Sequence, residues 1–334
     1  MATGYPHENA AGLGFEKSEE TYKMWAKYWT AFQARMQNSA RFDTNIQTLQ
    51  VNKSLKKYGQ FQNGTTNGKD GGRRWIFGMR HGERVDLTYG KWTPYCFQND
   101  TYIRKDLNMP LSLPQRAGGA ESYARDSPLT RVGRLQARLV GEGLRLAGVS
   151  VTRVYASAAL RCVETAHEML RGLEADPSVK VKVEPGLFEY KYWYIGKGLA
   201  PFMTPEELHK GGYNVDLGYK PYIDLDITSN ETLDDFYKRN EVVITSAYKD
   251  SEGDGNIMFV GHAATLDMMV TVLKRMGQDN AGKSYQISKN LLRVPYCALA
   301  AMRDKPMEAV EPPCPPSINS SSGRYDWKLL LEIS

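Results

Sequence analysis

The sequence predicts an α/β protein in which helices flank a mostly parallel central sheet. Two apolar runs, residues 75–79 and 256–260, have the length expected of buried strands, and each ends in a loop that holds glycine and histidine. Helical patterns alternate with the predicted strands along most of the chain, which is typical of one α/β domain. The composition agrees, because 41% hydrophobic and 24% charged residues are ordinary for a globular protein.

The first 72 residues are predicted to form an extension ahead of the main domain, which spans residues 73–334. Behind a Ser18 cap, aromatic and apolar residues recur at helical spacing from Tyr22 to Met36 and predict an amphipathic helix. Residues 61–72 are polar and rich in glycine, which indicates a flexible linker. We expect the aromatic stripe to pack on the main domain; a docking or dimerisation helix is the alternative.

The first predicted strand is followed at once by a charged loop. Ligands bind at the carboxyl ends of parallel strands, so Arg80, His81 and Arg84 are candidate site residues. The two guanidiniums stay charged, whereas the imidazole titrates near neutrality. This combination suits a site that binds a phosphate while a neutral ring nitrogen attacks phosphorus.

A long segment without clear periodicity, residues 85–127, comes next. Connections of this length inside a domain usually cover or shape a site. Its aromatic residues Tyr89, Trp92, Tyr95 and Phe97 either form an apolar wall of the site or a small satellite core.

A second strand and helix supply another candidate arginine. A helix is predicted to start at Pro128 and end at Gly148, with apolar positions at Val132, Leu135, Leu139, Val140 and Leu144. The strand that follows, residues 151–157, leads directly into a new helix, which begins at residue 158. Arg161 therefore lies in the first turns after a strand, where the helix amino terminus also favours an anion.

A third strand, residues 179–183, leads to a carboxylate among aromatic residues. We expect burial by these neighbours to raise the pKa of Glu189 and to keep it protonated as a proton donor. Phe188, Tyr190 and Trp193 are candidates for the apolar side of a substrate pocket, together with Tyr89 and Trp92.

The last third of the chain contains a second apolar strand that ends at a glycine and a histidine. Residues 231–248 are predicted to be helical, and the strand at 256–260 ends at Gly261 and His262 before a helix that runs through Val272. Residues 292–299 and the closing residues 323–334 are predicted strands, the last at the edge of the sheet.

Several functional classes are disfavoured by composition. The net charge of +5 is mild and spread along the chain, so no nucleic-acid or membrane surface is indicated. Four cysteines lie far apart without a CxxC pair, so we expect reduced thiols and neither a zinc site nor disulfides. We see no spacing of metal ligands and predict no metal or cofactor. The amino terminus lacks the pattern of a secretory signal, and no run could span a membrane, so a cytoplasmic protein is expected.

Four motifs together resemble those of the histidine phosphatase superfamily, also called the phosphoglycerate-mutase-like fold. They are RHGE at 80–83, SxxLRCVETA at 157–166, EPGLFE at 184–189 and GHAA at 261–264. The resemblance covers about residues 73–334 and implies a three-layer α/β fold. Longer matches, including RHGERVDLTYGKW and YIRKDLNMPLSLPQR, are similar to the phosphatase module of the suppressors of T-cell-receptor signalling and to their insect relatives, the ecdysteroid-phosphate phosphatases.

The signalling proteins carry a ubiquitin-associated domain and a Src-homology domain before this module, and neither is recognisable in residues 1–72. The resemblance therefore favours the insect group, which we expect to be similar in length to this chain and to stand alone.

The resemblance also implies roles for the candidate residues. His81 would be the nucleophile that accepts the phosphoryl group, His262 would stabilise that group from the opposite side, and Glu189 would be the general acid and later the base that activates water. Three arginines would bind the phosphoryl oxygens: Arg80, Arg84 and Arg161. Arg84 stands where most mutase-type members have a small residue, which favours the phosphatase subgroup.

Three functional hypotheses follow. The first is a metal-independent phosphomonoesterase that acts through a phosphohistidine and hydrolyses ecdysteroid phosphates. The second is a protein-tyrosine phosphatase, since a phosphotyrosine phenol would also suit an aromatic-lined cleft. The third is a non-catalytic binding module, which the intact set of charged residues disfavours. A homodimer is compatible with the superfamily, in which dimers are common.

Overall fold

A six-stranded sheet forms the centre of the computed structural model, which describes residues 73–194, 198–199, 202–226, 230–251, 253, 255–276 and 294–316. The predicted amino-terminal helix, the linker and the closing strand lie outside these residues. In spatial order the strands are β5 (Val181–Val183), β4 (Arg153–Ala156), β6 (Ile257–Gly261), β1 (Trp75–Arg80), β7 (Leu299–Arg303) and β8 (Glu308–Val310). The first four strands are parallel, whereas β7 pairs antiparallel with both of its neighbours, β1 and β8. The prediction of a mostly parallel sheet is therefore confirmed.

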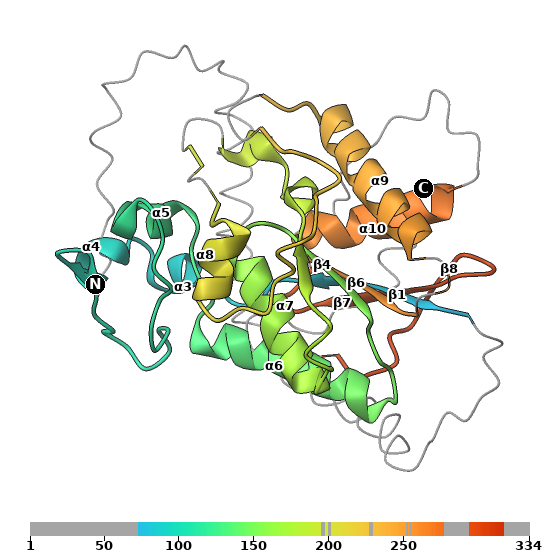
Figure 1. The fold of residues 1–334 in the computed structure, drawn as a ribbon, viewed down its shortest axis with the longest axis horizontal. Helices are drawn as coiled ribbons and strands as arrows, with labels where there is room; N and C mark the ends of the chain where they lie inside the picture. Colours follow the sequence, from blue (N-terminus) through green and yellow to red (C-terminus); the bar gives the residue numbers. More distant parts are fainter. Residues whose placement is uncertain are drawn as a thin grey trace, which may run out of the picture. The chain divides into compact units, whose positions relative to one another are not determined.

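Helices cover both faces of the sheet (Figure 1). One face is covered by α6 (Arg131–Leu146) and α7 (Leu160–Leu173), and the other by α9 (Leu233–Asp250) and α10 (Ala263–Arg275). Shorter helices lie in the connections: α3 (Val85–Tyr89), α4 (Thr93–Cys96), α5 (Gly119–Arg125), α8 (Pro205–Lys210) and the 3-10 turns η2 (Pro185–Leu187) and η3 (Lys191–Tyr194). This is the predicted three-layer arrangement.

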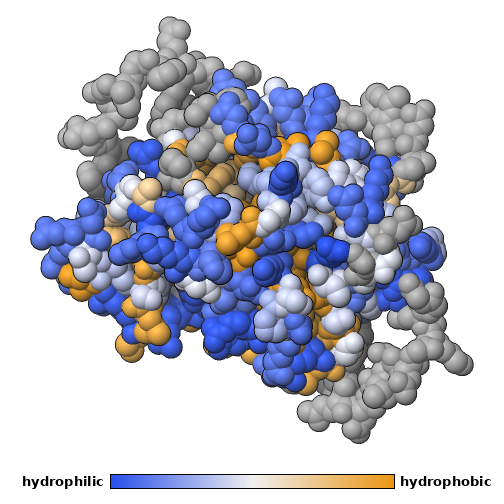
Figure 2. All heavy atoms as spheres, in the orientation of Figure 1, coloured by the Kyte–Doolittle hydropathy of each residue, from blue (hydrophilic) through white to orange (hydrophobic). Residues whose placement is uncertain are grey.

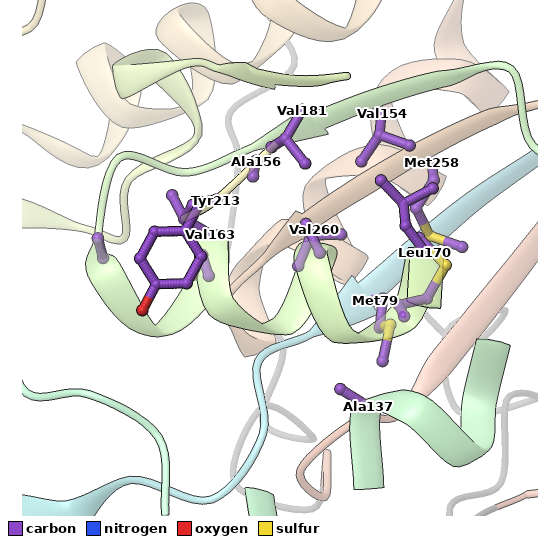
Figure 3. Packing of buried hydrophobic residues seen from close by; sticks show 14 of the residues in the cluster. Met79, Ala137, Val154, Ala156, Val163, Leu170, Val181, Tyr213, Met258 and Val260 are labelled. Carbon is purple, nitrogen blue, oxygen red and sulfur yellow. The ribbon is translucent and has the colours of Figure 1, made fainter. Parts of the chain in front are cut away.

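Alternate residues of each strand enter two separate cores. Phe77 and Met79 point toward α6 and α7, whereas Ile76 lies in the core beneath α9 and α10. Figure 3 shows the first core, where Met79, Val154 and Val260 from three strands gather against the helix that carries Val163. Burial on both faces explains why these strands read as continuous apolar runs.

Two glycines let α6 and α7 approach closely. A Cβ atom added at Gly141 would lie 1.9 Å from Met169 O, and one added at Gly172 would lie 1.9 Å from Arg138 O. The two helices therefore meet backbone to backbone near the end of α7.

Small residues line the buried side of α6, so several of its apolar residues face outward. Val132, Leu135 and Leu139 are 43%, 54% and 48% exposed, while Ala137 and Leu144 are fully buried. The visible face of the molecule is otherwise mostly hydrophilic, with apolar areas in separate places (Figure 2).

Two sequence predictions need correction. Residues 85–127 are not wholly irregular, because they contain α3, α4, α5 and a hairpin of β2 (Phe97–Gln98) and β3 (Thr101–Tyr102). These elements are too short to show a period in the sequence. The strand expected at 292–299 begins only at Leu299, because residues before it form a turn.

Other predictions can be checked directly. All four cysteines are free thiols, as predicted, and the structure also shows that all four are buried. None of the helices within the described ranges has both the length and the apolar character that crossing a bilayer requires.

Candidate active site

His81 lies directly after β1, and its surroundings select one tautomer. Its Nδ1 is 2.9 Å from Gly82 O, and a carbonyl can only accept, so the ring proton lies on Nδ1. The lone pair is therefore on Nε2. Burial lowers the pKa of His81 well below its ordinary 6.5, and Arg161 and Arg80 lower it further, so the ring is neutral near pH 7.

Gly82 is required by a close contact between this loop and α6. A Cβ atom at Gly82 would lie 2.5 Å from Gly133 O, and its N–H donates to Thr165 Oγ1 at 3.0 Å. The glycine of the RHG motif thus ties the nucleophile candidate to the starts of both α6 and α7.

Arg80 and Arg84 are held by partners that the sequence did not reveal. The Arg80 guanidinium donates to Val294 O, and its Cζ lies 4.7 Å from the centre of the Tyr296 ring. Arg84 forms a bidentate pair with Asp86, with distances of 2.9 and 2.6 Å. The positive charges of both guanidiniums help to lower the pKa of His81.

Arg161 lies in the first turn of α7, as predicted, and is 1% exposed. Its Nη2 donates to Glu189 Oε1 at 2.5 Å and lies 3.2 Å from the Tyr194 hydroxyl and 3.3 Å from His262 Nδ1. Burial opposes its charge, but Tyr194 and Glu189 outweigh this effect and raise the pKa of Arg161. The arginine therefore stays charged.

His262 follows β6 and has the opposite tautomer from His81. Its Nδ1 faces Arg161, which can only donate, so the ring proton lies on Nε2 and is donated to Ser157 Oγ at 3.0 Å. Burial lowers the pKa of His262 well below 6.5; Glu189 opposes this, whereas Arg161 adds to it. The ring of Phe188 packs edge to face against it, with centroids 5.4 Å apart.

Glu189 is ionised in this arrangement, and the expectation that it is protonated is wrong. Burial alone would raise the pKa of its carboxyl, as predicted from the aromatic neighbours. The positive charges of Arg161 and Arg84 and a hydrogen bond from Tyr194 outweigh burial and, with the adjacent His262, lower the pKa to about 2. The sequence showed the aromatic neighbours but not the cations that the fold brings from other elements.

The five aromatic pocket candidates have different surroundings. Trp92 is 2% exposed and packs with Phe97, Tyr102 and Tyr123, so the satellite-core alternative describes it better than a pocket wall. Tyr89 is partly exposed, and its hydroxyl donates to Asp106.

The other three candidates lie in the segment that carries Glu189. Phe188 is buried behind His262. Tyr190 packs against Phe236 and Trp193, on the side of the core beneath α9. A role for these residues in a substrate pocket stays a prediction.

Four further residues contact the candidate site, and sequence reasoning assigned them no role. They are Asp86, Ser157, Tyr194 and Tyr296. Ser157 is the first residue of the motif at 157–166, so its position alone could have suggested it. Tyr296 comes from the turn before β7, and only the fold brings it to within 5.8 Å of the His81 ring.

The arrangement joins two neutral imidazoles, three guanidiniums and one carboxylate at the carboxyl edge of the sheet. A phosphoryl group needs positive charge around its equatorial oxygens and a nucleophile in line with its leaving group. His81 Nε2 and the arginines can supply both. Within the described residues, no group of three or more His, Cys, Asp or Glu side chains could hold a metal ion.

The fold and this site define a histidine phosphatase domain. A family model described as "Histidine phosphatase superfamily (branch 1)" matches residues 116–292, and the chain belongs to that superfamily. The match includes Arg161, Glu189 and His262, whereas the RHGE motif precedes it. This relationship supports a phosphoric monoester hydrolase.

Three curated proteins are similar to this chain in sequence. The chain is 58% identical over 335 residues to the ecdysteroid-phosphate phosphatase of Bombyx mori, and 40% identical over 263 residues to that of Drosophila melanogaster. It is 36% identical over 264 residues to the mouse ubiquitin-associated and SH3 domain-containing protein B. These alignments cover 99%, 77% and 78% of this chain, respectively.

A crystal structure of the Bombyx mori ecdysone phosphate phosphatase in complex with tungstate is also similar. It has a TM-score of 0.71 and 63% identity, and the match covers 77% of this chain and all of that chain.

The chain spans only part of its curated relatives. It covers 50% of the Bombyx mori protein, 34% of the Drosophila protein and 41% of the mouse protein. The expectation that the insect relatives are similar in length to this chain is therefore wrong.

Proposed function

We propose that this chain is a metal-independent phosphomonoesterase that acts through a phosphohistidine at His81 and hydrolyses ecdysteroid phosphates. The observation that carries the mechanism is the tautomer of His81. Its Nδ1–H is bound to Gly82 O, so the free lone pair is on Nε2, and the pKa of the ring is low enough to keep that lone pair available.

In the first step, Nε2 of His81 attacks phosphorus, a P–N bond forms, and the ester P–O bond breaks. Arg80, Arg84 and Arg161 stabilise the charge on the equatorial oxygens. Nδ1 of His262 faces Arg161 and Glu189, so the ring lies beside the carboxyl whose charge changes during the reaction.

Glu189 supplies the proton that the leaving alcohol needs. Its pKa of about 2 means that the carboxyl must gain this proton when the substrate binds. A phosphate ester brings negative charge next to the carboxylate and competes for Arg161, and both effects raise the pKa of Glu189. After the alcohol leaves, the carboxylate removes a proton from water, which attacks the phosphohistidine and releases phosphate.

The substrate assignment rests on the similarity to two insect ecdysteroid-phosphate phosphatases. Tungstate is a tetrahedral oxyanion like phosphate, and its presence in the similar Bombyx mori structure agrees with an oxyanion site in this fold. A cytoplasmic location and a homodimer stay predictions.

The test compares kcat/KM for an ecdysteroid phosphate and a phosphotyrosine peptide, both with chelator and with His81→Ala as the blank. We expect the steroid to be preferred by roughly a hundredfold, or about 2.7 kcal/mol of transition-state binding. The opposite preference would identify a protein-tyrosine phosphatase. No His81-dependent activity on either substrate would support a non-catalytic binding module.

A further inference from the structure

The segment that carries Glu189 lies between two short 3-10 turns, η2 and η3, and residues 188–190 belong to neither. Hydrogen bonds within a helix or strand therefore do not fix the backbone of Glu189. Its position depends on the side chains that hold this segment from outside.

Arg239, on α9, holds the first half of the segment. It is 6% exposed, and its Nη1 donates to Gly186 O at 2.6 Å and to Phe188 O at 2.7 Å. Its Nη2 also lies 3.5 Å from the carbonyl oxygen of Glu189 itself. Only the planar fork of arginine can donate to several acceptors in this way.

Glu231 holds both the arginine and the second half of the segment. Its two oxygens accept from Arg239 Nε at 2.8 Å and Arg239 Nη2 at 3.0 Å. The second oxygen, Oε2, also accepts from the backbone N–H of Lys191 at 2.9 Å. The buried pair thus contacts the main chain on both sides of Glu189.

We propose that Arg239 and Glu231 are positioning residues for proton transfer. They hold residues 186–191 so that Glu189 Oε1 lies 2.5 Å from Arg161 Nη2 and accepts a hydrogen bond from the Tyr194 hydroxyl. The hydrogen bonds of both side chains are made with each other and with the main chain of this segment. The inference rests on the proposed function, in which Glu189 protonates the leaving group. A carboxyl displaced by about 1 Å transfers its proton much less efficiently.

The decisive variant is Glu231→Gln, which keeps the size and shape of the side chain. An amide has one acceptor oxygen in place of two, so it cannot serve both edges of Arg239 and the Lys191 N–H. Its NH₂ group would instead face another donor. Arg239→Lys is the second variant, because it keeps the charge but loses the fork.

The readout is the dependence of kcat on the leaving group. An alkyl phosphate needs a protonated leaving group much more than p-nitrophenyl phosphate does. We expect Glu231→Gln to lower kcat roughly 30-fold on the alkyl ester and less than threefold on the aryl ester, with little change in KM. In a Glu189→Gln background the same change should have no further effect on the alkyl ester.

Asp304→Asn is the matched control, because Asp304 forms a buried ion pair with Arg74 at 2.8 Å just before β1, at the opposite end of that strand from His81. This variant measures the general effect of weakening a buried ion pair, and we expect it to lower kcat by the same factor on both esters. Equal losses on both esters for Glu231→Gln, or a full additional loss in the Glu189→Gln background, would overturn the proposal.

A crystal structure of Glu231→Gln separates this inference from the proposed function. We expect the distance from Glu189 Oε1 to Arg161 Nη2 to exceed hydrogen-bonding range, whether or not the enzyme hydrolyses either ester. If the carboxyl moves but the wild-type protein is inactive, the proposed function fails and the positioning role stands. If the carboxyl stays at its present distance, the positioning role is wrong.

Discussion

The rings of His81 and His262 lie edge to face, with centroids 5.5 Å apart. They follow β1 and β6, which are adjacent parallel strands, and His81 N donates to Gly261 O at 2.9 Å. The pairing of the two strands therefore sets the separation of the two rings. Burial lowers the pKa of both imidazoles, so the positive charge of the site comes from its arginines.

Replacing Glu189 should expose its role as an acid. We expect Glu189→Gln to lower kcat roughly 100-fold or more on a steroid phosphate, and tenfold or less on an aryl phosphate, because a phenolate leaves without full protonation. Steady-state kinetics on the two esters measures this, with exposed Glu121→Gln as the control. Equal losses on both esters would remove the acid assignment.

Ser157 should matter because it fixes the tautomer of His262. Removing the hydroxyl in Ser157→Ala leaves the buried Nε2–H without its acceptor and frees the ring to turn. We expect kcat to fall roughly tenfold with little change in KM, and Ser157→Thr to restore most of it. An unchanged kcat in the alanine variant would show that the ring is held by Phe188 and Arg161 alone.

Acidification should destabilise the fold from about pH 6.5 downward. His81 and His262 have lowered pKa values in the folded protein, so below 6.5 the unfolded chain binds protons that the folded chain does not. Each histidine can then lower the free energy of unfolding by up to about 1.4 kcal/mol per pH unit. Glu189 adds a further loss of stability as the pH falls from 4.5, the ordinary pKa of its carboxyl, to about 2, its pKa in the folded protein.

Urea unfolding between pH 7.5 and 5 measures this slope. His262→Asn should reduce it, and the same substitution at exposed His209 on α8 provides the comparison. An identical slope in wild type and His262→Asn would mean that the ring is not buried in its neutral form.

The contact between α6 and α7 should not tolerate a methyl group at Gly172. The added Cβ would lie 1.9 Å from Arg138 O, so the helices must separate. We expect Gly172→Ala to lower the free energy of unfolding by about 3 kcal/mol. Glu142→Ala on the exposed side of α6 is the control. A variant as stable as wild type would contradict the close backbone contact.

The fold was predictable because its strands are buried on both faces. Residues 75–79 and 257–260 are apolar without interruption, and their ends mark the carboxyl edge where His81 and His262 lie. α6 was predictable as a helix, but not the outward position of Leu135 and Leu139. That position follows from the glycine contacts with α7, which no period in one helix reveals.

The candidate site was predictable as a set of residue types, but not as an electrostatic arrangement. The protonation of Glu189 depends on Arg161 and Arg84, which reach it from two other segments. Tyr296 lies more than 200 residues after His81 in the chain and meets it only through the pairing of β1 and β7. Such contacts depend on strand order, which local sequence does not encode.

The most direct test of the central claim is to trap the phosphoenzyme. Wild-type protein mixed with ³²P-labelled phosphate ester and quenched within milliseconds should carry an acid-labile, alkali-stable label on His81, and His81→Ala should carry none. A labelled His81→Ala protein, or a wild-type protein that turns over substrate without any label, would contradict a phosphohistidine mechanism.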